Sequence, residues 1–329
     1  MRAACHPLHI QTTLATLLFA MTTAAPAGAY ETDQLTDRMV ELHDAAEFAD
    51  RKVNDLLSLA MEDTNTQTQC RGSERHTRAV LARNVYRQMA DPTYVRGRGE
   101  LAGFGYGAYA AWLETDPRID RREVGHYDDI YTRVRPVDSL VLGTVGVCST
   151  IRLAGILMGT DKPDHFWAQG YEYFRTSRGG RRDARAWDRG VADERGKYGL
   201  LTSGVFSFAD LAANWAGYQF YKGLLTKASP LQRDDTGCVA QASPFRWGDW
   251  ISDAVDEVLN PSNYVEEVAI AVVAHLIAER SAVCAAYTVW GAEVVTRREA
   301  VLQEEAEHLS PNAPTRVDTW RLDVLCKRR

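Results

Sequence analysis

The chain has 329 residues, of which 45% are hydrophobic, and its formal net charge is −6. This length is sufficient for a sizeable core in one large domain or two modest ones. Acidic and basic residues are mixed along the chain, and the basic tract at 178–189 also contains glycines and two aspartates. The charge pattern therefore gives no reason to expect a nucleic-acid partner.

The first 29 residues have the pattern of a secretory signal peptide. Arg2 supplies a positive charge, residues 14–21 form a short apolar run, and residues 27–29 fit the small-residue cleavage rule. Cleavage there would leave a mature chain of residues 30–329, for which we predict a periplasmic or secreted location.

The mature chain contains an odd number of cysteines: Cys70, Cys148, Cys238, Cys284 and Cys326. In an oxidising compartment this number predicts one or two disulfides and a remaining thiol. Cys70 and Cys238 lie in polar, loop-like sequence and are reasonable members of a disulfide. Cys148 and Cys284 lie in apolar sequence that is typical of buried thiols.

Apolar residues recur at alternating steps of four and three over residues 35–60. This pattern predicts a long amphipathic heptad helix near the mature N-terminus. Further helices are expected over 73–89, 207–225 and 262–308, and no run of alternating strands is found. The predicted fold class is all-α, a multi-helix bundle or array in a single domain spanning 30–329.

Two other stretches have a bearing on the fold. Residues 140–158 are largely apolar, which approaches the length of a membrane span. Arg152 interrupts this stretch, so we expect a buried core helix and no stable membrane span after signal removal. The Gly/Arg-rich segment at about 176–200 is expected to form a mobile flap.

Four polar residues in the apolar segment 159–174 are spaced by 4, 4 and 3: Asp161, His165, Gln169 and Glu172. In an α-helix these positions lie on one face. An aspartate can orient a histidine that acts as general acid or base, or both can ligate a divalent metal. A capping aspartate and a satisfied core histidine would give the same pattern.

Two further candidates come from later segments. Asp210 and Asn214 are one helical turn apart among aromatic residues. They could meet the polar face of segment 159–174 across a helix–helix interface. A local hydrogen-bonded pair is the alternative for these two residues. Glu194 lies in Gly-rich sequence and is conceivable as a general acid for glycan cleavage, although a solvated loop also explains it.

These residues define a site hypothesis. The predicted catalytic residues are His165, Glu172, Asp210 and Glu194. The predicted substrate-binding residues are Gln169, Asn214 and Lys162, and the predicted ligands of a divalent metal are Asp161 and His165.

The site predicts a hydrolase or lyase that acts on an envelope component such as peptidoglycan glycan. Two alternatives remain open. One is a non-catalytic envelope assembly or binding protein, in which these polar residues form buried hydrogen-bonded networks. The other is a divalent-metal-binding protein without turnover. The expected partner is accordingly a cell-wall glycan or an envelope protein.

The hexapeptide 161–166, Asp-Lys-Pro-Asp-His-Phe, resembles the D-K-x-x-H-F motif of VanZ-like proteins and of related small bacterial envelope lipoproteins. The wider sequence, with 207–217 and 260–264, is similar to uncharacterised exported proteobacterial proteins. The resemblance implies a Gram-negative envelope setting and implies no particular activity.

Overall fold

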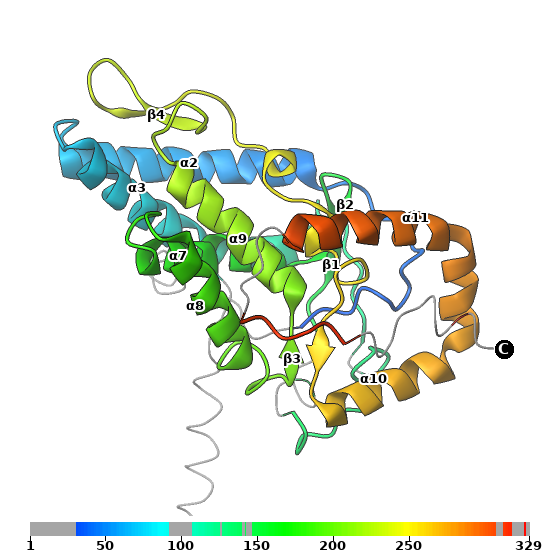
Figure 1. Cartoon of the computed structure of the whole chain (residues 1–329). Helices are drawn as coiled ribbons and strands as arrows, with labels where there is room; N and C mark the ends of the chain where they lie inside the picture. The colour runs from blue at the N-terminus through cyan, green and yellow to red at the C-terminus, as the bar shows by residue number, and fades with distance from the viewer. Residues whose placement is uncertain are drawn as a thin grey trace, which may run out of the picture.

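The computed structural model describes residues 31–91, 107–125, 127–139, 142, 147–306, 312–317 and 326. Helices dominate the described chain, and three antiparallel strand pairs accompany them (Figure 1). The predicted signal peptide, residues 1–29, lies outside the described residues.

The helical elements are, in chain order, α2 (Ala46–Thr68), α3 (Glu74–Met89), α5 (Ala108–Thr115), α6 (Asp161–Asp164), the π-helical turn η1 (His165–Gln169), α7 (Gly170–Thr176), α8 (Asp183–Arg195), α9 (Phe208–Gly223), the 3-10 turns η2 (Trp247–Asp249) and η3 (Asp253–Val255), α10 (Glu266–Ala278) and α11 (Arg280–Ala306). The strand pairs are β1 (Thr150–Leu153) with β2 (Ile156–Gly159), β3 (Val205–Phe206) with β6 (Asn263–Tyr264), and β4 (Leu231–Arg233) with β5 (Val239–Gln241).

The all-α prediction is wrong where these strand pairs form. β1 and β2 lie in the stretch for which we expected a buried core helix. Ala154 and Gly155 connect them with φ angles of 51° and 81°. Positive φ at both loop residues is the geometry of a tight two-residue hairpin turn, so the local turn overrides the apolar pattern.

The predicted long N-terminal heptad helix is also wrong. α2 begins only at Ala46, so the first part of the pattern lies outside it. The carboxylate of Asp33 accepts hydrogen bonds from the backbone N–H groups of Leu35 and Thr36, at 2.8 and 3.0 Å. This turn competes with a helix start, and Met39 is half-exposed instead of packing on a partner helix.

The segment 176–200, expected to be a flap, contains α8. Trp187 and Val191 of this helix are buried, and Trp187 stacks on Trp215 of α9 with ring centroids 4.5 Å apart. This part of the chain is therefore a packed helix between Gly/Arg-rich turns.

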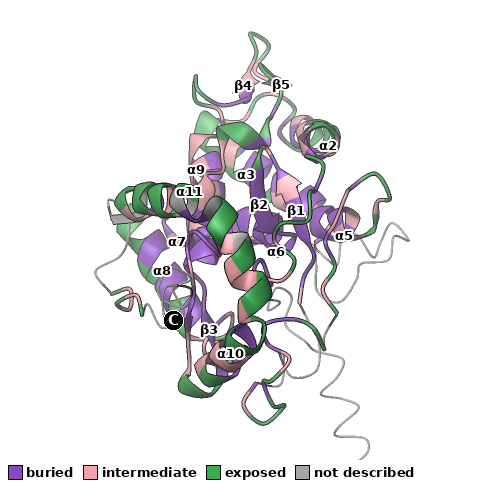
Figure 2. Cartoon of the chain, turned by 90° about the vertical axis from the view of Figure 1, so that its right-hand side faces the viewer, coloured by how far each residue is buried: buried purple, intermediate pink, exposed green. Residues whose placement is uncertain are grey.

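Two glycines hold the segment from α6 to α7 close to α9. A Cβ atom on Gly170 would lie 2.6 Å from the backbone of Gly217, so neither position has room for a side chain. Aromatic rings surround this crossing, including Phe166, Trp167 and Phe220. The crossing brings the polar residues of segment 161–165 close to Asp210 and Asn214 of α9. Figure 2 shows that α6 lies in the buried interior.

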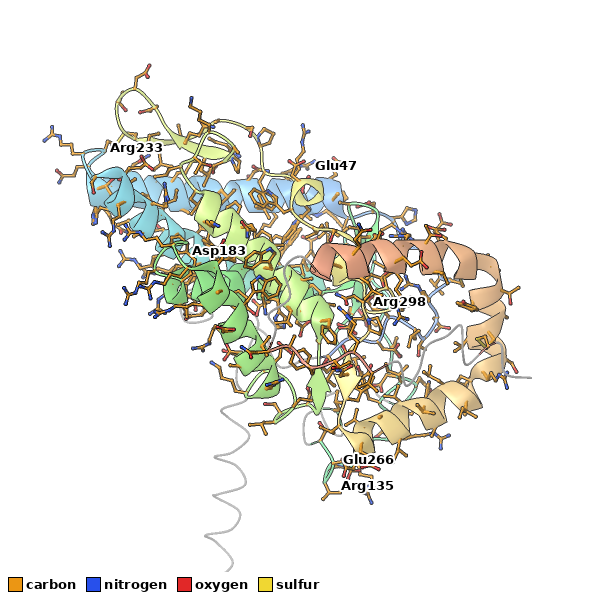
Figure 3. The ribbon with its side chains drawn as sticks, in the orientation of Figure 1. Glu47, Arg135, Asp183, Arg233, Glu266 and Arg298 are labelled. Carbon is orange, nitrogen blue, oxygen red and sulfur yellow. A yellow bond between two sulfur atoms is a disulfide. The ribbon has the colours of Figure 1, made fainter. Side chains whose placement is uncertain are left out.

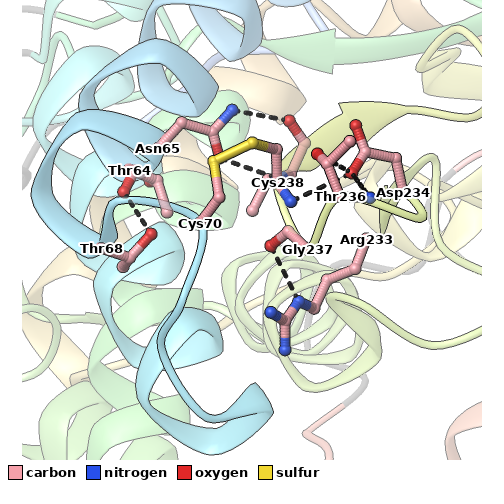
Figure 4. Close-up of a disulfide and its surroundings, with 10 residues drawn as sticks. Thr64, Asn65, Thr68, Cys70, Arg233, Asp234, Thr236, Gly237 and Cys238 are labelled. Carbon is pink, nitrogen blue, oxygen red and sulfur yellow. Dashed lines mark hydrogen bonds between the residues drawn. A yellow bond between two sulfur atoms is a disulfide. The ribbon is translucent and has the colours of Figure 1, made fainter.

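Two disulfides close distant parts of the chain. Cys70 after α2 pairs with Cys238 beside β5 (Figure 4). The side-chain amide of Asn65 donates to the backbone carbonyl of the neighbouring Val239 at 2.9 Å and accepts from its N–H at 2.7 Å. Cys284 pairs with Cys326, so the prediction of a buried thiol at Cys284 is wrong.

Cys148 is buried and takes no part in either disulfide. The two disulfides fit an oxidising, extracellular compartment. Within the described ranges, no single helix has both the length and the apolar composition of a membrane span.

The Cys70–Cys238 link closes a loop of 168 residues. Replacing both cysteines by serine should lower the free energy of unfolding by about 2–5 kcal/mol, because the unfolded chain gains conformational freedom. Urea unfolding of the purified protein measures this change. An unfolding midpoint equal to that of the wild type would contradict the structural role assigned to this disulfide.

Candidate functional site

A buried lysine lies at the centre of the candidate site. The Lys162 ammonium nitrogen is 2.6 Å from one carboxylate oxygen of each of three residues: Asp161, Asp210 and Glu257. Lys162 is only 1% exposed, so these carboxylates replace the water that would otherwise solvate its charge. The lysine thereby connects α6, α9 and the segment after η3.

The side chain of His165 lies between two oxygen atoms. Its Nε2 atom is 3.2 Å from Asp210, and its Nδ1 atom is 3.0 Å from the amide oxygen of Asn214. The Asn214 amide nitrogen donates to the Tyr173 hydroxyl at 3.0 Å, which turns the amide oxygen toward the imidazole. Nδ1 therefore carries a proton, and Nε2 is left to donate to Asp210 or to ligate a metal.

Two further buried glutamates lie beside this centre. Glu31 accepts a hydrogen bond from the Ser203 hydroxyl at 2.6 Å, and its second carboxylate oxygen is buried with no hydrogen-bond partner among the described residues. Glu194 accepts from the backbone N–H of Ser207, the residue that caps α9, at 3.2 Å. The negative charge of Asp210 raises the pKa of both glutamates.

Burial and charge shift the protonation of these groups in opposite directions. Burial, together with neighbouring carboxylates, raises the pKa of Glu31 and of Glu194 well above the ordinary value and that of Glu257 to about 8. Burial alone would also raise the pKa of Asp210, but the positive charges of His165 and Lys162 lower it. Burial lowers the pKa of Lys162, but the carboxylates of Asp161, Asp210 and Glu257 outweigh burial and raise this pKa well above the ordinary value.

The N-terminal end of the described chain covers the cluster. The Thr32 hydroxyl donates to Asp161 at 2.9 Å, and the backbone N–H of Glu257 donates to the side chain of Gln34 at 2.9 Å. Residues 31–34 are all buried. This polar segment thus belongs to the wall of the site.

The structure brings together most of the residues that the sequence singled out. Those that lie in or beside the cluster are Asp161, Lys162, His165, Glu194, Asp210 and Asn214. Glu172 lies elsewhere, since it is partly exposed and pairs with Arg175 at 2.8 Å. Gln169 is buried at the end of η1, beyond the cluster.

The π-helical turn explains why Glu172 is displaced. Spacings of 4, 4 and 3 residues place Asp161 and Glu172 on one face only in a continuous α-helix. In the structure, His165–Gln169 form i→i+5 hydrogen bonds instead. A wider turn rotates every later residue relative to Asp161. Glu31 and Glu257 are not among the predicted site residues, because neither belongs to a set of polar residues at helical spacing.

Three side chains in the cluster could hold a metal ion. Asp161, His165 and Asp210 each offer one ligand atom, and these atoms lie within 4.8 Å of one another. Two carboxylates and an imidazole form a donor set that suits divalent transition metals.

The cluster is closed to solvent within the described part of the chain. Its members are at most 8% exposed, and three surface pockets of about 770, 610 and 420 Å³ are lined by other residues. Among the described residues, the charged cluster is thus buried and does not line any of these three pockets.

No protein-family model, curated protein or solved structure matches this chain. The resemblance of residues 161–166 to VanZ-like proteins therefore remains a prediction.

Replacing Lys162 by methionine should lower the free energy of unfolding by about 3–5 kcal/mol, because it leaves buried carboxylates without their cation. Thermal or urea unfolding at neutral pH measures the loss.

Lys222→Met is the matched control for this variant. Lys222 pairs at 2.7 Å with Asp183, which is labelled in Figure 3, and both side chains are partly exposed. Its loss should cost less than about 1 kcal/mol. Equal effects of the two variants would contradict a central role for Lys162.

Proposed function

We propose that this chain is an exported protein that binds one divalent metal ion between Asp161, His165 and Asp210. The orientation of His165 carries the proposal. Asn214 accepts from Nδ1 and is itself held by Tyr173, which leaves Nε2 directed toward the Asp210 carboxylate. Metal-ligating histidines are commonly fixed in this way, through a hydrogen bond from the other ring nitrogen.

The number of acidic side chains in the cluster supports a metal ion beside Lys162. Five buried carboxyl groups gather around that lysine and His165: Glu31, Asp161, Glu194, Asp210 and Glu257. The raised pKa values of Glu31, Glu194 and Glu257 mean that these acids hold protons at neutral pH, which a bound metal ion would displace. A buried carboxylate oxygen of Glu31 also has no hydrogen-bond partner among the described residues. A divalent ion would lower the electrostatic cost of the arrangement.

Zn²⁺ and Mn²⁺ are the ions that this donor set favours, because imidazole suits the first and carboxylate oxygen the second. The envelope setting of the proposal is supported by the two disulfides and by the signal-peptide pattern at residues 1–29. The VanZ-like motif at 161–166 is consistent with the same setting.

Binding is favoured over turnover by the burial of the cluster. A hydrolase acting on peptidoglycan glycan would have to bring a polymer to His165, which is 4% exposed. Glu172, the expected second acid, is paired with Arg175 away from His165. Hydrolysis of an envelope component remains a prediction of the sequence alone, as does an envelope partner protein.

Thermal unfolding of EDTA-treated protein with added ZnCl₂ or MnCl₂ tests the proposal. We expect one of these ions to stabilise the wild type, by about 2.7 kcal/mol when the free metal concentration is a hundred times the Kd. His165→Ala should abolish this stabilisation, and Asn214→Ala should weaken metal binding by about 10–100-fold through the loss of the outer hydrogen bond.

Glu172→Gln is the matched control, because it removes a nearby predicted site residue that lies outside the cluster. It should retain the full response to metal. The proposal fails if neither ion stabilises the wild type, or if His165→Ala responds as strongly as the wild type does.

A further inference from the structure

We propose that a cationic cleft between α3 and α7 binds a ligand that carries several phosphate groups. The cleft has a volume of about 610 Å³, and the two helices that border it lie side by side in Figure 1. Its charged lining residues are Glu74, Arg75, Arg78, Arg175, Arg178 and Arg181. None of them belongs to the metal cluster, so this inference is independent of the proposed function.

The cleft has a charge opposite to that of the whole chain. Five arginines and one glutamate give a formal charge of 5 − 1 = +4, whereas the chain carries −6. Such a local excess of positive charge attracts anions.

Internal ion pairs neutralise only part of this charge. Glu74 pairs with Arg78 at 2.6 Å, and Glu172 outside the cleft pairs with Arg175. The side chains of three exposed arginines have no ion-pair partner among the described residues: Arg75, Arg178 and Arg181. Three guanidinium groups are thus available to an external anion.

The wall of the cleft also contains a hydrogen-bond donor that is not used. The Nε atom of Arg78 is buried and has no hydrogen-bond partner within the described chain, although its Nη2 atom contacts Glu74. A buried donor in this state costs free energy, which an oxygen acceptor in the cleft would recover if the Arg78 side chain turned toward it.

The backbone fixes the arginines that follow α7. Arg178, Gly179 and Gly180 have φ angles of 60°, 72° and 81°, and the N–H of Gly180 donates to the Ser177 hydroxyl at 2.9 Å. A Cβ atom on Gly180 would lie 2.7 Å from the side chain of Lys222, so the turn packs closely against α9. The turn therefore fixes the backbone of the segment that carries Arg178 and Arg181.

Aromatic rings form the floor of the cleft. Tyr171 and Phe174 line it, and both are largely buried. Tyr171 stacks on Tyr86 of α3 with ring centroids 4.7 Å apart, which fixes the distance between the two helices. The two helices that border the cleft are thus packed firmly against each other.

The chemistry of the arginines identifies the class of ligand. A guanidinium group presents parallel N–H donors that match the oxygens of a phosphate. Several such groups in one cleft fit a multiply charged anion better than a single carboxylate. A soluble polyphosphorylated compound and a phosphorylated lipid headgroup share this chemistry.

Isothermal titration of the full mature chain with inositol hexakisphosphate tests the inference. The wild type should bind the probe, and Arg75→Ala/Arg181→Ala should weaken binding by about tenfold or more, because charge-assisted hydrogen bonds are lost. Arg195→Ala/Arg246→Ala removes the same charge from exposed positions outside the cleft and should change the Kd by less than about twofold.

Co-sedimentation with phosphatidylcholine vesicles, with and without phosphatidic acid, distinguishes the two sources of phosphate. Cleft-dependent binding to the phosphatidic acid vesicles assigns a lipid headgroup, and binding of the soluble probe alone assigns a soluble ligand. The inference is overturned if the wild type binds neither probe, if both double variants weaken binding equally, or if a single-stranded oligonucleotide binds more tightly than the hexakisphosphate.

Discussion

The burial of the Lys162 ammonium group is the constraint on which the rest of the site depends. A charge removed from water must find its partners within the protein, and here they come from α6, α9 and the segment after η3. The close glycine contact between Gly170 and Gly217 makes this arrangement feasible, because it lets the helix that follows Lys162 approach α9. Packing and electrostatics therefore specify the same crossing.

The same constraint accounts for the polar segment 31–34. Thr32 and Gln34 make hydrogen bonds to Asp161 and to the backbone of Glu257, so the segment satisfies groups that burial would otherwise leave unpaired. Glu31 adds another carboxylate to the interior. The result is a closed cluster with more acids than bases, which is the electrostatic setting we propose for a metal ion.

The sequence predicts part of this arrangement for a clear physical reason. Polar residues one helical turn apart among large apolar neighbours must face the interior, so His165 and Asp210 could be expected to meet, and they do. The position of Glu172 could not be predicted, because the π-helical turn before it leaves no mark in the residue spacing. Glu257 approaches Lys162 from 95 residues away, and no local pattern reports such a contact.

The secondary structure likewise includes elements that the local sequence predicts and elements that it does not. The helices α3 and α9, each of which begins after a capping serine, lie close to where the sequence predicts them. The β1–β2 hairpin replaces an expected helix because two residues adopt positive φ, one of them an alanine that gives no signal for a turn. Turn chemistry and tertiary contacts decide these elements, and residue periodicity does not describe either.

Anomalous diffraction at the zinc edge, from crystals of the mature protein grown with ZnCl₂, shows directly whether the cluster holds a metal ion. We expect a peak at about 2.0–2.1 Å from Nε2 of His165, with carboxylate oxygens of Asp161 and Asp210 at about 2.0–2.2 Å. Zinc found only at surface residues, with Nε2 still donating to Asp210, would contradict it.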